Sequence, residues 1–142
     1  MKIIITKENL IKSLQKVIGV VEKRQTMPIL SHVLFRKNND TYEVVASDLE
    51  VQLSCSVTLE AGSDFTSDVT IPGRKLFDIG KGLPDESILE INLEDENKIQ
   101  IKSKKSKFIL SALDARTFPI MDTTDENSIP FSFKSQNLKD II

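Results

Sequence analysis

Residue types that build common catalytic and metal sites are scarce in this sequence. Its 142 residues include one cysteine and one histidine. A single cysteine excludes an internal disulfide, which fits a reducing compartment, and Cys55 lies on the apolar side of a predicted strand. The lone His32 leaves little room for a Ser/His/Asp triad or a histidine-rich metal site, and its place beside strand residues favours packing. We therefore expect no catalytic residue, no metal and no cofactor.

Net charge and long apolar runs are also lacking. The formal net charge is only −2, so bulk attraction to nucleic acid is excluded and any basic surface must be local. The apolar run within residues 1–10 is too short for a signal peptide, and no stretch is long enough to cross a bilayer. We expect a cytoplasmic protein without a membrane partner. With 39% apolar and 28% charged residues, the chain can bury a core, and one domain is the starting expectation.

The chain contains the same order of predicted elements twice. A strand, a helix and three strands are predicted at 2–5, 7–18, 31–37, 42–47 and 51–59, and again at 69–71, 72–83, 87–93, 98–103 and 107–113. Ile5 and Leu10 precede Ile71 and Leu76 by 66 residues. This is a duplicated β-α-β-β-β unit, at 1–60 and 66–113. Neither copy covers its sheet alone, so we predict one α+β domain over 1–115, with two helices on one side and antiparallel sheets on the other.

Both predicted helices have one apolar face and one exposed face that carries basic residues. Their apolar faces consist of Leu10, Leu14, Val17, Ile18, Leu76, Ile79 and Leu83. The acidic residues fall mainly in strand edges, turns and the 114–128 segment. Basic helices over an acidic sheet would attract phosphate on one side and repel it on the other. Charge alone favours the alternative that these helix faces are simply solvated.

A second domain is predicted to begin near the end of the chain. Residues 116–128 are polar, acidic and interrupted by proline, as is typical of an interdomain linker. Residues 129–142 then repeat the start of the first unit, with a strand at 130–133, a possible helix cap at Ser135 and Leu138 in the place of Leu10. We expect the chain to come from a longer polypeptide.

Several motifs resemble a known family. They are Arg24, residues 26–30 (TMPIL), 47–50 (SDLE), 71–79 (IPGRKLFDI), 82–84 (GLP), 107–108 (KF) and 118–119 (FP). In this order and spacing they closely resemble the first domain of the bacterial sliding clamp, the β subunit of DNA polymerase III. The resemblance implies the DNA-clamp fold, in which three domains of two β-α-β-β-β units form each subunit. Two subunits close head to tail around duplex DNA.

The resemblance also implies which residues contact DNA. In the family the helices line the hole, so Lys12, Lys16, Arg24, Arg74 and Lys81 are expected to face the phosphates. Such contacts are electrostatic and carry no sequence information. The expected role is processivity in DNA replication: the ring stays on DNA by topology and tethers the replicative polymerase, without chemistry of its own.

The last hairpin, residues 98–113, is implied to form the subunit contact of the homodimer. Its final strand is apolar on both faces, which an exposed edge strand should not be. Phe108 and Leu110 are the expected apolar anchors, and Lys75, Lys98, Lys105 and Lys107 the expected ionic partners. The replicative polymerase and the clamp loader would bind through domains two and three.

Two other classes of function remain open at this stage. An enzyme could use Asp48 with Glu50, or the acidic turn 94–96, to hold a divalent cation, but turn carboxylates without further ligands usually hold none. A protein-interaction module that does not bind DNA is the main alternative. Such a module has no need for the exposed Arg74 and Lys81.

Overall fold

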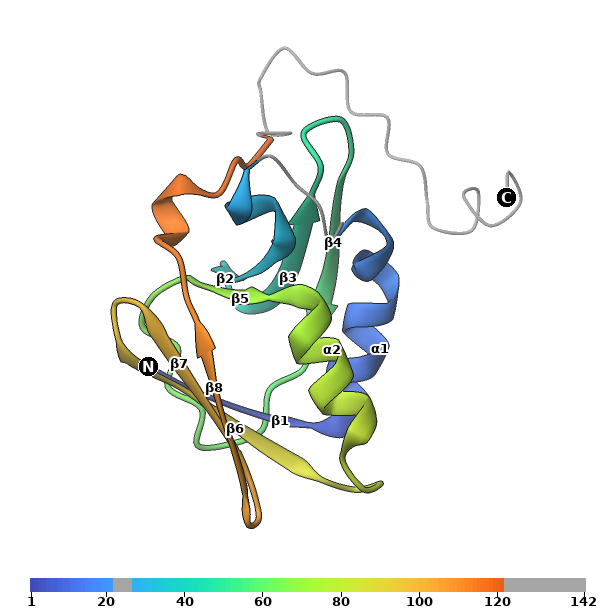
Figure 1. Ribbon diagram of the computed structural model, residues 1–142, viewed down its shortest axis with the longest axis vertical. Coiled ribbons are helices and arrows are strands. Elements are labelled where there is room, and N and C mark those ends of the chain that lie inside the picture. The colour runs from blue at the N-terminus through green and yellow to red at the C-terminus, as the bar shows by residue number, and fades with distance from the viewer. Residues whose placement is uncertain (22–26, 122–142) are drawn as a thin grey trace, which may run out of the picture.

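The computed structural model describes residues 1–21 and 27–121 and confirms the duplicated order of elements (Figure 1). The first unit contains β1 (Lys2–Thr6), α1 (Lys7–Val17), β2 (His32–Asn38), β3 (Thr41–Ser47) and β4 (Gln52–Val57). The second contains β5 (Val69–Pro72), α2 (Gly73–Gly82), β6 (Ile88–Asp95), β7 (Lys98–Ser103) and β8 (Ser106–Ser111). Short 3-10 turns lie at Ile18–Val20, Pro28–Ser31 and Ala115–Thr117. The predicted α+β fold is therefore correct.

The two units exchange their first strands, which the sequence analysis did not predict. One sheet has the order β1-β6-β7-β8 and the other β4-β3-β2-β5, and every neighbouring pair is antiparallel. Strand β1 pairs with β6 of the second unit, with Ile5 opposite Leu89, and β5 pairs with β2 of the first, with Ile71 opposite Val33. Each sheet thus needs both units, which ties the domain together.

Both helices lie side by side and share one core with both sheets (Figure 1). Thr6 caps α1, because its hydroxyl accepts a hydrogen bond from the Asn9 amide at 3.2 Å. Helix α2 begins at Gly73, because Pro72 still belongs to β5 and serves as the cap residue. The inward residues are fully buried and come from the helices and from both sheets: Leu10, Leu14, Leu76, Ile3, Ile5, Ile91, Ile101, Val33, Val44 and Ile71.

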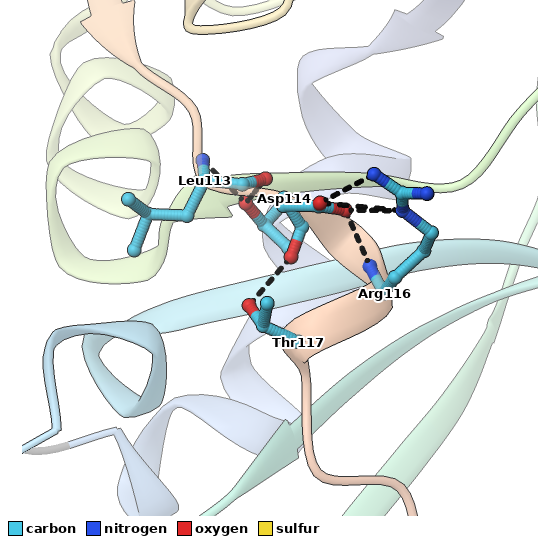
Figure 2. A network of polar contacts seen from close by, with 5 residues as sticks. Leu113, Asp114, Arg116 and Thr117 are labelled. Carbon is cyan, nitrogen blue, oxygen red and sulfur yellow. Dashed lines mark hydrogen bonds and ion pairs between the residues drawn. The ribbon is translucent and has the colours of Figure 1, made fainter.

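A second, smaller apolar cluster covers the outer face of the β4-β3-β2-β5 sheet. It is formed by Ile29, Leu30, Leu34, Val45 and Phe118. The chain reaches it after β8, through a turn in which the Asp114 carboxylate accepts hydrogen bonds from the Arg116 amide and guanidinium at 2.9–3.2 Å (Figure 2). Leu113, Ala115 and Phe118 therefore pack against this cluster, while Arg116 and Thr117 are exposed.

The apolar side of the strand predicted at 51–59 is buried only in part. Val57 is buried and Cys55 is half-buried against the core, but Leu53 and Val51 are 36% and 47% exposed. The cause is position, because β4 is the edge strand of its sheet and α1 covers only part of it. Among the described residues, no helix is long and apolar enough to span a membrane.

Candidate nucleic-acid interface and subunit contact

The candidate nucleic-acid interface is the exposed side of the α1–α2 pair. The helices approach closely at Gly80, where an added Cβ atom would lie 2.9 Å from Ile11 Cδ1. Gly80 lowers the helix propensity of α2. Its structural role is to let the two helices pack against each other, because any side chain there would displace Ile11.

Four of the five predicted DNA contacts lie within the described residues. Lys12 and Lys16 are exposed on α1, one turn apart, and Lys81 is exposed in the last turn of α2. Arg74 is half-buried, and its Nε donates a hydrogen bond to the Val21 carbonyl at 3.0 Å. Arg24 lies outside the described residues. The helix pair thus exposes three lysines, while Arg74 is anchored to the end of the first helical segment.

Lys7 has a role in this interface that the sequence did not reveal. Its side chain is only 17% exposed, and its Nζ donates to the Leu83 carbonyl at 2.5 Å. The Lys81 carbonyl lies 3.4 Å from the same Nζ, and the Asp85 carboxylate 3.6 Å. Lys7 therefore joins the first turn of α1 to the end of α2. No local pattern marks this contact, because it joins residues 76 positions apart.

The candidate subunit contact is the β7–β8 hairpin. Strand β8 stands at the end of its sheet, with Lys105 and Lys107 exposed around the tip and Lys98 exposed at the start of β7. Lys75 is also exposed, on the first turn of α2. The structure thus leaves all four predicted ionic partners accessible to solvent.

Phe108 and Leu110, the predicted apolar anchors, are half-buried and pack against the main core. The opposite face of β8 carries Ile109, which is 51% exposed. Leu113 does not lie in β8, and it contacts the second apolar cluster. The apolar residue that β8 leaves in solvent is therefore Ile109, while Phe108 and Leu110 each have one side covered by their own domain.

The outer face of the β1-β6-β7-β8 sheet is mixed in charge, although an acidic sheet was expected. Glu90 lies opposite Lys102, Lys102 lies opposite Lys107, and Lys2 Nζ is 3.7 Å from the Glu90 carboxylate. The hydrogen bond from Asn92, assisted by the charges of Lys2 and Lys102, holds the pKa of Glu90 below its usual value. This surface offers ion-pairing groups of both signs.

The acidic turns considered for cation binding use their carboxylates for backbone contacts. Asp48 Oδ1 accepts hydrogen bonds from the Glu50 and Val51 amides at 2.9 and 2.7 Å, and Asp95 Oδ1 accepts one from Asn97 at 2.8 Å. These are turn-stabilising contacts of the Asx type. Within residues 1–21 and 27–121, no group of three or more potential metal ligands comes together.

Comparison with known proteins agrees with this arrangement. A family model for the N-terminal domain of the DNA polymerase III beta subunit matches residues 1–122. The beta sliding clamp of Pseudomonas aeruginosa is 40% identical over 138 residues, which are 97% of this chain and 37% of that protein. The Escherichia coli beta sliding clamp is 33% identical over the whole chain and 38% of its own length.

Solved structures of these relatives share the fold. A crystal structure of the Pseudomonas aeruginosa sliding clamp superposes with a TM-score of 0.79 at 41% identity, covering 86% of this chain and 32% of that one. The beta subunit of Caulobacter crescentus gives 0.78 at 31% identity, over 87% and 33% of the two chains. The fold and the matched residues define the first domain of a sliding clamp.

The chain therefore belongs to the DNA polymerase III beta subunit family, the bacterial beta sliding clamps. It spans less than two fifths of the length of the relatives from Pseudomonas aeruginosa and Escherichia coli. The relatives are named as clamps, which is a role without catalysis.

Proposed function

We propose that this chain is part of a DNA sliding clamp, in which a head-to-tail homodimeric ring encircles duplex DNA. The ring tethers the replicative polymerase and so makes DNA synthesis processive. It needs no cofactor, and the clamp loader and polymerase bind through domains that follow residues 1–115. In this proposal residues 116–128 are the linker and 129–142 begin the second domain.

The observation that carries this proposal is the packed helix pair with its exposed lysines. Lys12, Lys16 and Lys81 supply exposed positive charge on a rigid support, and none belongs to a cluster that could read base edges. Arg74 is proposed as a further contact, and Arg24, which lies outside the described residues, is proposed as a contact from the resemblance alone. Each contact is weak, because the charges are solvated and screened by salt, so the ring can move along the duplex while topology retains it.

The decisive test separates topological retention from ordinary affinity. The protein from its complete reading frame is loaded onto nicked circular DNA by its clamp loader, and the complex is isolated by gel filtration. Retention should be lost when the circle is cut once with a restriction enzyme. Equal retention on circular and linear DNA contradicts a ring, and failure to load, with the loader active on another clamp, favours the protein-interaction module.

The proposed subunit contact involves Lys75, Lys98, Lys105, Lys107, Phe108 and Leu110. Strand β8 would extend the sheet of the partner subunit through its free edge, with the lysines meeting acidic groups. Because Phe108 and Leu110 also contact their own core, charge reversal at exposed lysines is the cleaner test.

We expect the double substitution Lys105→Glu and Lys107→Glu to weaken the dimer about tenfold or more in sedimentation velocity, because two attractive pairs become repulsive. Lys37→Glu makes the same type of charge change on the β2–β3 hairpin, outside the proposed contact, and should leave the dimer intact. A dimer that survives the double substitution with unchanged affinity places the contact elsewhere.

A further inference from the structure

The end of α2 is held in place by groups from outside its last turn. This turn contains Gly80 and Gly82 and stops before Pro84, so its own helix propensity is low. The Lys7 ammonium group donates to the Leu83 carbonyl at 2.5 Å and lies 3.4 Å from the Lys81 carbonyl. A cation at this position satisfies free carbonyl groups and offsets the negative end of the helix dipole.

The Lys81 side chain is held by a second contact. Its Nζ lies 5.3 Å from the centroid of the Phe77 ring, within the range of a cation–π interaction. Phe77 is itself half-buried and packs against the main core, so the ring is a fixed platform. Lys81 is thus anchored through its backbone by Lys7 and through its ammonium group by Phe77.

The two exposed lysines of α1 have no comparable support. With the described residues, Lys12 and Lys16 form no ion pair or hydrogen bond through their side chains. Each must therefore lose most of its side-chain freedom when it meets a phosphate, which opposes binding through conformational entropy. Lys81 has already lost part of that freedom.

We propose that Lys7 and Phe77 are positioning residues that make Lys81 a pre-oriented phosphate contact, in contrast to the freely moving Lys12 and Lys16. This inference rests on the proposed DNA-clamp function. Lys7 itself does not contact DNA, because its ammonium donors are used at the end of α2. It also removes free carbonyl oxygens from the surface beside Lys81, where they would repel a phosphate.

A first experiment tests the positioning without DNA. In the 142-residue chain, NMR relaxation of the lysine Cε methylene groups should show Lys81 more restricted than Lys12 and Lys16. Phe77→Leu removes the ring, and Lys7→Met removes the cation while keeping an apolar stem; each should increase the mobility of Lys81 toward that of Lys12. Lys7→Arg should preserve the restriction. Equal mobility of Lys12, Lys16 and Lys81 in the unchanged chain overturns the proposal.

A second experiment measures the coupling between Lys7 and Lys81 on DNA. The affinity of the complete protein for a short fluorescent duplex is measured by anisotropy at several salt concentrations, for Lys7→Met, Lys81→Met and the double variant. Each single change should weaken binding about two- to fivefold, and the double variant should be no weaker than Lys81→Met. The pair Lys7→Met and Lys16→Met is the control and should be additive.

The outcomes separate this inference from the proposed function. An effect of Lys7→Met that persists unchanged in the Lys81→Met background means that Lys7 acts on DNA directly or only through stability, and it overturns the proposal. Rescue by Lys7→Arg supports it, since the arginine keeps a charged donor at the Leu83 carbonyl. If the unchanged protein is retained equally on cut and circular DNA, the ring function fails, while the NMR result still decides the positioning.

Discussion

The two β-α-β-β-β units have the same order of elements, but the outer faces of their sheets differ in character. One outer face is apolar and covered, and the other is charged and faces solvent. In the first unit, Leu34 of β2 lies opposite Val45 of β3, and both are buried. The pairing of the sheets places Glu90 of β6 and Lys102 of β7 at the equivalent positions of the second unit, and this pair faces solvent. One backbone pattern therefore supports an apolar face in one sheet and a charged face in the other.

The segments that follow the last strand of each unit explain the difference. After β4, residues 60–64 run along β1 and form backbone hydrogen bonds with it, including Glu60 N to Ile4 O at 2.7 Å. After β8, the chain leaves its own sheet and crosses to the other one (Figure 1). There Phe118 packs with Leu34 and Val45 in the second apolar cluster. One sheet receives an apolar cover, and the other remains open.

The duplicated fold thus has one sheet face that is covered by the chain and one that is open to solvent. The covered face contributes to stability within the chain. The open face extends to the free edge of β8, where Lys107 lies opposite Lys102. In the other sheet, the residue equivalent to Lys107 is Ser54 of β4, which lies opposite Val45. The lysines at the β8 edge fit the proposed subunit contact, because charge at an edge strand prevents unspecific pairing until a complementary partner is present.

The largest expected effect comes from exchanging the two equivalent residues Val45 and Lys102. Val45→Lys should destabilise the chain by more than about 4 kcal/mol, because it buries an unpaired ammonium group beneath Phe118. Lys102→Val removes an exposed charge and should change stability by less than about 0.5 kcal/mol. The free energy of unfolding from urea titrations of both variants is the measurement.

Lys102→Val is the control for Val45→Lys, because the two positions are equivalent in the two sheets. If Val45→Lys does not fold, Val45→Ala provides a second value, expected at about 2–3 kcal/mol for a buried truncation. Similar losses at Val45 and Lys102 contradict the contrast between a covered and an open face.

The sequence predicted the elements of the fold well but not how they assemble. Hydrophobic periodicity and the 66-residue spacing identified both helices and all eight strands of the two units within the described residues. The strand exchange of β1 and β5 was missed, because periodicity shows which face of a strand is buried and not which strand lies beside it. The cover by Phe118 was missed for a similar reason, since an isolated aromatic residue in a polar segment has no period.

An intermediate effect is expected from the pH dependence of His32. This residue is only 6% exposed, its Nδ1 has no hydrogen-bond partner among the described residues, and burial lowers its pKa from 6.5 to about 4. Between these values the unfolded chain binds a proton that the folded chain does not. Stability should therefore fall by up to about 3 kcal/mol as the pH drops from 6.5 to 4, and change no further below 4 through this group.

The variant His32→Leu isolates this contribution. Carboxylates titrate in the same range, so the difference between the unchanged chain and His32→Leu is measured by urea titration at each pH. The free energy of unfolding of His32→Leu minus that of the unchanged chain should be constant above pH 7 and increase toward pH 4. The equivalent residue in the other sheet, Ile88, is 54% exposed and supplies a control, because Ile88→Leu should leave the pH profile unchanged. Parallel profiles for His32→Leu and the unchanged chain would falsify the assignment.

The candidate site was predictable only where exposure follows from a helical period. Lys12, Lys16 and Lys81 are exposed, as their helix faces predict. Arg74 is half-buried and Lys7 is nearly buried, because both reach the far end of the neighbouring helical segment, and such contacts depend on tertiary packing. Arg24 lies outside the described residues, so its placement remains a prediction from the resemblance.

The smallest of the three effects is expected where a segment of irregular chain is bonded to the edge of each sheet. Leu113 lies beside β5 in one sheet, and residues 60–64 lie beside β1 in the other. Thr70 of β5 is fully buried, and its hydroxyl group accepts a hydrogen bond from Leu113 N at 2.9 Å and donates one to Leu113 O at 2.8 Å. Thr70→Val keeps the shape but leaves both Leu113 groups unpaired, which should cost about 1–2 kcal/mol in urea titrations. The Ser63 hydroxyl group forms hydrogen bonds with the Ile4 amide and carbonyl groups, but the backbone hydrogen bond from Glu60 N to Ile4 O already holds this segment against β1. Ser63→Ala should therefore lower the free energy of unfolding by less than Thr70→Val. The reverse order would show that the contact of residues 60–64 with β1 also depends on a side-chain hydroxyl group.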